Sequence, residues 1–295
     1  MSCYRFIRAQ MLYYPVRRLC QVLGVGVASY YRWQKKATSH PLVRAWEQAL
    51  CQTFIQHQRR YGTRRLRAEL QAQGHMVGRH RIRQVLRRRD LVAVQPRAFV
   101  PCTTRSEQGP RVAPNHVLHQ PPPTAADQIW VGDITYLPLQ NGRWAYLAAF
   151  QDVYSKRVVG WQVLGSMPEE LVVTALRRAL LSRQPAAGLL VHSDRGGQYC
   201  GTGYRRLLTE RQLVRSMSRK GNCYDNAQAE SLWSRVKTEV LLDRSSFTSV
   251  AEAQADLATY FDYYNHQRRH SALGYECPHT FEQQVLSTNA QLCLT

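Results

Sequence analysis

The sequence lacks any long uninterrupted apolar stretch. Its longest apolar runs, such as residues 145–150, are far too short to cross a bilayer, and the N-terminus has no apolar signal segment. These absences argue against membrane insertion and secretion. We therefore expect a cytoplasmic protein with no membrane partner.

Paired cysteines and heptad repeats are also missing. Eight cysteines are scattered along the chain without a single C-x-x-C pair. Neither a zinc knuckle nor a disulfide framework is therefore indicated, and reduced, partly buried thiols are expected. No sustained heptad repeat is present, so the sequence predicts no leucine zipper of its own.

Acidic side chains are scarce in the first part of the chain. Residues 1–120 contain 22 basic and 4 acidic side chains, a net charge of +18, whereas residues 121–295 contain 18 and 16, a net charge of +2. Arginine outnumbers lysine in the first part, which favours bidentate phosphate contacts. This asymmetry indicates a polyanion-binding module joined to a domain with another task. A solubilising basic surface and a ribosome-type RNA binder are the alternatives.

Two helix-turn-helix patterns occupy the basic part. Residues 15–36 read as helix, glycine turn and short helix, and residues 61–91 repeat the pattern with an apolar inner face. The alternative for either is a small helical bundle with a solvated basic face. The outer face of the last helix is suited to a phosphate backbone and carries Arg79, Arg81, Arg83, Arg87, Arg88 and Arg89.

The second half of the chain has an α/β pattern. Seven prolines between residues 96 and 123 predict an extended linker. Strands are predicted at 128–139, 144–152, 157–164, 188–193 and 213–217, and helices at 168–183, 202–210 and 227–241, with a further helix at 249–264. The order predicts a mixed five-stranded sheet flanked by helices, preceded by an all-α region.

Three carboxylates stand in distinctive settings. Asp133 lies within an apolar strand, Asp194 ends a buried strand before two glycines, and Glu230 lies in the first turns of a helix rich in small residues. Three hard oxygen ligands on two strands and a helix suit Mg²⁺. Two such ions, roughly 3.5–4 Å apart, could serve an in-line phosphodiester displacement. A turn or cap residue is the alternative for any one acid.

Three other acids and a histidine compete for roles at this site. Asp152 is expected in a turn and Asp225 as a helix cap, and neither they nor Asp262 are expected to bind metal directly. His192 either orients a ligand or is a hydrogen-bonded core residue. The aromatic residues between 260 and 264 are expected to pack rather than to stack on bases.

Four segments together resemble a known family. They are W-V-G-D-I-T-Y at 130–136, H-S-D-R-G-G-Q-Y at 192–199, S-R-K-G-N-C-Y-D-N-A-Q-A-E-S at 218–231 and Y-Y-N-H-Q-R-R-H-S-A-L-G-Y at 263–275. The chain resembles the DDE transposases of the insertion sequence 3 group in their OrfB form, which have a retroviral-integrase-like core. The resemblance implies an RNase H-like core with Asp133, Asp194 and Glu230 as metal ligands. Trp233 stands where Phe is common in this family.

The patterns along the chain, together with the resemblance, give a domain plan and a set of expected DNA contacts. The expected parts are 1–57 (helical, with a helix-turn-helix), 58–95 (second DNA-binding unit), 96–124 (linker), 125–243 (catalytic core) and 244–295 (C-terminal helical extension). Lys237 follows Glu230 by two helical turns and is expected at the DNA end, with a solvated lysine as the alternative. The expected DNA contacts are Lys237, Arg219, Lys220, Arg79, Arg81, Arg83, Arg87, Arg88, Arg268 and Arg269.

The implied activity is cleavage at element ends followed by strand transfer of the freed 3′-hydroxyl, through a circular DNA intermediate. Two Mg²⁺ ions are expected, with Mn²⁺ as a substitute. The expected partners are double-stranded DNA, further copies of this chain on paired ends, and an upstream-frame helix-turn-helix and leucine-zipper product, in the nucleoid of a bacterial cell. The alternatives are a DNA-binding regulator with a silent core and an RNase H-type nuclease without strand transfer.

Overall fold

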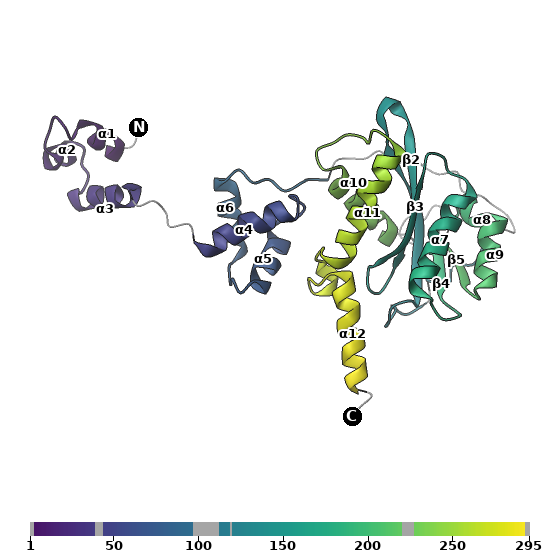
Figure 1. Ribbon diagram of the computed structural model, residues 1–295. Coiled ribbons are helices and arrows are strands. Elements are labelled where there is room, and N and C mark those ends of the chain that lie inside the picture. The colour runs from purple at the N-terminus through teal and green to yellow at the C-terminus, as the bar shows by residue number, and fades with distance from the viewer. Residues whose placement is uncertain (1–2, 39–43, 97–111, 119, 220–226, 293–295) are drawn as a thin grey trace. The chain divides into compact units, whose positions relative to one another are not determined.

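The computed structural model describes residues 3–38, 44–96, 112–118, 120–219 and 227–292 (Figure 1). Lys220, Asp225 and most of the predicted linker and of the loop at 218–226 lie outside these residues. The chain forms two compact units, Met1–Gln52 and Thr53–Thr295. In the described residues, no helix has the length and apolarity needed to cross a membrane.

The first unit is a small helical cluster. It contains α1 (Cys3–Gln10), α2 (Val16–Val22) and α3 (Val27–Thr38), and the boundary with the second unit falls within α4 (Ala45–Gln56). Ile7, Cys20 and Tyr30 form its buried core. Gly24, between α2 and α3, has a φ of +63°, a backbone conformation that favours glycine. The predicted helix, glycine turn and helix are confirmed.

A second helical pair begins the second unit. α5 (Thr63–Ala72) buries Leu66 and Leu70, and α6 (Arg79–Arg88) buries Ile82, Val85 and Leu86. Because these positions recur every three or four residues, one face of each helix is apolar. The opposite face of α6 and its C-terminal cap expose all six predicted arginines.

A mixed five-stranded sheet forms the centre of the second unit. Its strands are β1 (Ile129–Pro138), β2 (Trp144–Asp152), β3 (Val158–Leu164), β4 (Leu190–Ser193) and β5 (Val214–Met217), in the order β3-β2-β1-β4-β5. The β1–β2 and β2–β3 pairs are antiparallel, and β1–β4 and β4–β5 are parallel. The turn η1 (Gln140–Gly142) joins β1 to β2, as the Asn-Gly pair predicted. The predicted fold class is confirmed.

Helices cover both faces of the sheet (Figure 1). α7 (Glu169–Arg183), α8 (Gly197–Cys200) and α9 (Thr202–Glu210) pack together on one face, while α10 (Ala227–Leu241) and α11 (Val250–His266) pack on the other. A Cβ at Gly160 of β3 would lie 2.4 Å from the carbonyl oxygen of Ala175, so only glycine allows α7 to approach this closely. η3 (Ser271–Leu273) and α12 (Pro278–Leu292) complete the described chain.

Candidate active site

Two of the three acids are neighbours across parallel strands. In the β1–β4 register, Gly132 lies opposite Ser193, so Asp133 and Asp194 each come one residue later on adjacent strands. Paired strands lie about 4.8 Å apart, and side chains at matched positions project to the same side. The two half-buried carboxylates therefore meet at one edge of the sheet. Backbone N–H groups fix both: Ile134 donates to Asp133 Oδ1 over 2.8 Å, and Gly196 donates to Asp194 Oδ1 over 3.0 Å.

The third acid arrives on α10, which packs against β1. Glu230, Trp233 and Lys237 occupy positions i, i+3 and i+7, which share one face of a helix. The indole N–H of Trp233 donates to Asp133 Oδ2 over 2.9 Å, which fixes this face toward the strand. Glu230 is exposed and Lys237 is half-buried beside this contact.

Burial and neighbouring charges shift the pKa values of Asp133, Asp194 and Lys237. Burial above all, and then the nearby carboxylates of Asp194 and Glu230, raise the pKa of Asp133 to about 7, while the N–H groups of Trp233 and Ile134 oppose the rise. Burial also raises the pKa of Asp194. Burial lowers the pKa of Lys237 to about 8, against the pull of the Asp133 carboxylate. All three acids and Lys237 thus belong to one electrostatic neighbourhood.

Two of the three acids are placed to bind a divalent cation together, and the third is not. Neighbouring carboxylates lose their repulsion when a divalent ion neutralises them, so Asp133 and Asp194 are suited to bind one together. Over the described ranges, however, no three His, Cys, Asp or Glu side chains are arranged to hold a metal ion. The exposed Glu230 side chain therefore completes a three-acid site only by turning toward the other two.

Two residues at the site were not predicted from the sequence. The Trp233 indole donates a hydrogen bond to Asp133, which a Phe ring at this position could not do. The spacing of three residues between Glu230 and Trp233 indicates that both lie on the same helix face, but it does not indicate this hydrogen bond. Tyr199 of α8 is buried, its hydroxyl has no hydrogen-bond partner in the described part of the chain, and burial with the charges of Asp133 and Asp194 raises its pKa. Tyr199 ends the segment H-S-D-R-G-G-Q-Y at 192–199, but its place beside the acids was not predicted.

The competing residues have structural roles. His192 is fully buried, with Nδ1 2.8 Å from the Ser216 hydroxyl and Nε2 3.1 Å from the Ser218 hydroxyl, so it is a hydrogen-bonded core residue. Asp152 accepts from the backbone N–H of Ser155 over 2.7 Å, which confirms the predicted turn. Asp262 pairs with His266 on the surface.

Arg268, an expected phosphate contact, is buried and engaged within the protein. Its side chain is 1% exposed and donates to both carboxylate oxygens of Glu239, over 2.6 and 2.7 Å. Arg269 is also engaged within the protein, where it pairs with Glu69 and donates to the carbonyl of Tyr275 over 2.9 Å. Arg219 is exposed at the end of the described segment. The packing predicted for the aromatic residues is confirmed, since Tyr260, Phe261, Tyr263 and Tyr264 are all buried.

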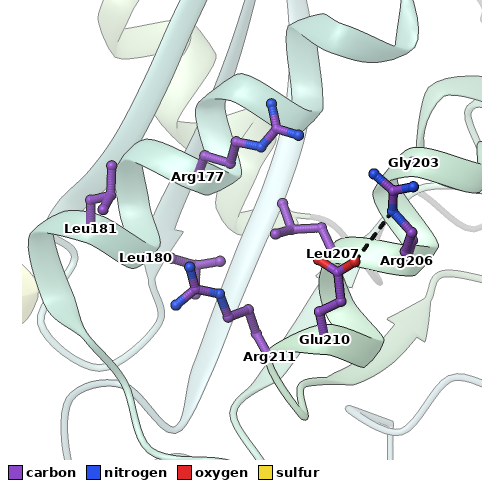
Figure 2. A pocket seen from close by; sticks show the side chains of 8 residues that line it. All are labelled: Arg177, Leu180, Leu181, Gly203, Arg206, Leu207, Glu210 and Arg211. Carbon is purple, nitrogen blue, oxygen red and sulfur yellow. Dashed lines mark ion pairs between the residues drawn. The ribbon is translucent and has the colours of Figure 1, made fainter.

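A hollow of about 220 Å³ lies between α7 and α9 (Figure 2). Arg177, Arg206 and Arg211 line it together with Glu210, which pairs with Arg206 over 3.3 Å. α7 and α9 cover the face of the sheet opposite α10 (Figure 1), so the hollow is separate from the three acids.

Sequence profiles of two families match this chain. The family described as "Integrase core domain" matches residues 123–223 and, in a second profile, residues 212–278. An "HTH-like domain" matches residues 46–99. The first range contains Asp133 and Asp194, the second contains Glu230, and the third contains α5 and α6.

Similar solved structures cover about half of the chain, and relatives in sequence cover nearly all of it. Among solved structures, the HTLV-2 integrase catalytic core in complex with magnesium is 12% identical to this chain, covers 54% of this chain and 98% of its own, and has a TM-score of 0.43. The catalytic core of BIV integrase is 16% identical, covers 56% of this chain and 99% of its own, and also has a TM-score of 0.43. The "Insertion element IS600 uncharacterized 31 kDa protein" of Shigella sonnei is 41% identical over 90% of this chain and 98% of that protein. "Transposase InsF for insertion sequence IS3A" of Escherichia coli K12 is 35% identical over 96% of this chain and 99% of that protein. At this identity and coverage, the chain belongs to the IS3 family of DDE transposases, with an integrase core and an HTH-like domain.

Proposed function

We propose that this transposase cuts a phosphodiester at each end of its element and joins the freed 3′-hydroxyl to another DNA strand. The observation that carries the proposal is the meeting of Asp133 and Asp194 on adjacent parallel strands, under the α10 face that holds Glu230, Trp233 and Lys237. A core that served only as a scaffold for a DNA-binding regulator would gain nothing from carboxylates that repel one another.

The reaction consists of two displacements at phosphorus. In the first, a water oxygen bonds to phosphorus as the bond to the 3′-oxygen breaks, which leaves a 5′-phosphate and a 3′-hydroxyl. In the second, that 3′-oxygen bonds to a target phosphorus, a target 3′-oxygen leaves, and one proton passes from the attacking to the leaving group. Neither step needs a covalent enzyme intermediate, and both can use the same side chains.

The residues at this edge of the sheet have separate tasks in the proposed reaction. Asp133 and Asp194, with Glu230 as the third ligand, would hold two Mg²⁺ ions, for which Mn²⁺ would substitute. When bound, these ions would supply Lewis-acid activation of the attacking oxygen and charge stabilisation of the leaving oxygen. Trp233 orients the Asp133 carboxylate, and the half-buried ammonium of Lys237 would contact a phosphate of the DNA end.

The substrate would be double-stranded DNA, both element end and target. The exposed arginines of α6 form a basic surface suited to an element end. The family also suggests that further copies of the chain assemble on paired ends and that an upstream-frame helix-turn-helix and leucine-zipper product assists. A labelled element end incubated with Mg²⁺ and target DNA tests the chemistry: joined product supports it, cut product alone indicates a nuclease, and a gel shift alone indicates a regulator.

Replacing Trp233 by Phe should weaken metal binding while preserving the packing of α10. The ring remains, but Asp133 Oδ2 loses the hydrogen bond that orients it. Loss of such a partner to a metal ligand typically costs about 10- to 100-fold in metal affinity or activity. The measurement is the Mn²⁺ or Mg²⁺ concentration needed for half-maximal cleavage, together with direct Mn²⁺ binding by calorimetry. Trp161→Phe is the control, since Trp161 lies on β3, and unchanged metal binding in Trp233→Phe would contradict the orienting role.

Replacing Arg83 and Arg87 by Gln should weaken DNA binding and reduce its salt dependence. These residues lie one turn apart on the exposed face of α6. Each lost phosphate contact should lower the slope of log affinity against log salt by about 0.9. Fluorescence anisotropy with labelled duplex at several salt concentrations measures both effects. Arg206→Gln/Arg211→Gln removes the same charge from the hollow of Figure 2, and an equal loss there would show that only net charge matters.

A further inference from the structure

Helix α10 is held from two opposite sides. One face carries Glu230, Trp233 and Lys237 toward Asp133. Glu239 follows Glu230 by about two and a half turns, so it lies on the opposite face of the helix. The Glu239 side chain is only 7% exposed. A buried carboxylate requires charged or hydrogen-bonding partners, and these partners hold the outer face of α10.

The partners of Glu239 come from two different parts of the second unit. Arg268 binds both carboxylate oxygens, and the Tyr260 hydroxyl donates to Oε2 over 3.1 Å. Arg65, on α5 of the helical pair, reaches Oε1 over 3.5 Å. One carboxylate on the helix that carries Glu230 therefore contacts both the region after α11 and the HTH-like domain.

Two more side chains, both from the segment between α4 and α5, contact the same part of α10 and α11. Nε of Arg60 donates to the backbone carbonyl of Glu239 over 2.9 Å, and the Arg60 guanidinium lies 4.8 Å from the centre of the Tyr263 ring. Nδ1 of the buried His57 lies 3.0 Å from the Tyr263 hydroxyl. Arg60 thus binds the main chain of α10 directly, at the residue whose side chain Arg65 contacts.

Tyr61 continues this contact toward the segment after α11. The Tyr61 hydroxyl donates to the carbonyl of Gln267 over 3.2 Å and accepts from the backbone N–H of Arg269 over 2.8 Å. Arg269 in turn pairs with Glu69 of α5. The contact between the HTH-like domain and the rest of the second unit is therefore polar and largely buried.

We propose that Glu239 is a positioning residue that couples the HTH-like domain to Glu230 through α10. Arg60 and Arg65 fix the position of α5, and with it α6, relative to α10. The DNA position at which α6 binds would therefore determine which phosphodiester reaches the three acids. This inference rests on the proposed function, since it concerns the position of the cut. If this contact is weakened, cleavage should spread over neighbouring phosphodiesters instead of occurring at one position.

The test is a cleavage map of an end-labelled element end with the full-length protein. Arg60→Met/Arg65→Met removes both contacts to Glu239 from the HTH-like side and leaves the Glu239–Arg268 pair intact. Arg64→Met/Arg67→Met is the matched control, because it removes two exposed positive charges from α5 itself. We expect wild type and control to cut at one dominant phosphodiester, and the Arg60/Arg65 variant to move at least about a third of its cuts to adjacent positions, which leaves the original position a preference of about twofold, or about 0.4 kcal/mol.

Three outcomes separate the possibilities. If the wild type leaves the DNA uncut, the proposed function fails. If the wild type cuts and the Arg60/Arg65 variant cuts at the same phosphodiester, at whatever rate, the coupling is overturned while the function stands. An equal spread in the control also overturns it. Should the double variant fail to fold, Tyr61→Phe removes only the hydroxyl that bonds Gln267 and Arg269, and unchanged cut positions there count against the coupling in the same way.

Discussion

Replacing Asp133 by Asn should abolish strand cleavage while DNA binding remains. Asn has nearly the same shape but lacks the charge that a divalent ion requires. We expect the cleavage rate to fall by at least about 10³-fold, the scale on which an active site loses several kcal/mol of metal-derived stabilisation. The affinity for an element end should be unchanged, because the arginines of α6 are distant in sequence and unaltered. Single-turnover cleavage and fluorescence anisotropy measure the two quantities.

The same substitution should not destabilise the fold. Burial and the charges of Asp194 and Glu230 disfavour the ionised form of Asp133 without metal, which is why its pKa is raised to about 7. A neutral side chain removes this repulsion, but the Asn amide can accept only one of the two hydrogen bonds that Ile134 and Trp233 donate to Asp133. Because these two effects oppose each other, the melting temperature of Asp133→Asn in a chelating buffer should stay close to that of wild type. Asp262→Asn, at an exposed position on α11, is the matched control for cleavage. Cleavage by Asp133→Asn within about threefold of wild type, less than 1 kcal/mol, would rule out the proposed chemistry.

The strands and the two aspartates could be predicted because their signals are local. Alternating apolar residues, the Asn-Gly turn and the short apolar run before Asp194 define the strands within a few residues each. Once 128–139 and 188–193 were predicted as strands of one sheet, both acids could be assigned to its edge. The adjacency of Asp133 and Asp194 follows from the pairing of Gly132 with Ser193, which is a property of the folded sheet.

The contacts that long-range packing creates could not be predicted in the same way. α8 has four residues, too few to show a helical period, so the motif at 192–199 contained Tyr199 without indicating that its side chain lies near the acids. The Arg268-Arg269-His270 run indicated a phosphate contact because exposed basic clusters usually have that role. Its actual partner, Glu239, lies 29 residues earlier, on another helix. The sequence shows that this cluster is basic, but the acidic partner of Arg268 is identified only by the tertiary packing.

Replacing Arg268 by Met should therefore destabilise the fold rather than weaken DNA binding directly. Burial alone would raise the pKa of Glu239, but the Arg268 guanidinium holds it below its usual value. Without Arg268, the carboxylate keeps only the Tyr260 hydroxyl and the distant Arg65 contact. Leaving one partner of a buried ion pair uncompensated typically costs about 3–5 kcal/mol in the free energy of unfolding. Denaturant unfolding at neutral pH measures this loss.

The pH dependence and a second variant distinguish this role from a phosphate contact. In Arg268→Met, burial would raise the pKa of Glu239 in the folded state above its unfolded value, so the penalty is present at neutral pH and shrinks as the pH falls through that raised pKa. Arg268→Met/Glu239→Gln should recover much of the lost stability, because no buried charge remains. Arg206→Met, in an exposed pair with Glu210, should change the free energy of unfolding by no more than about 1 kcal/mol. A stable Arg268→Met protein with reduced DNA affinity would instead restore the phosphate contact, and would require the guanidinium to leave Glu239 when DNA binds.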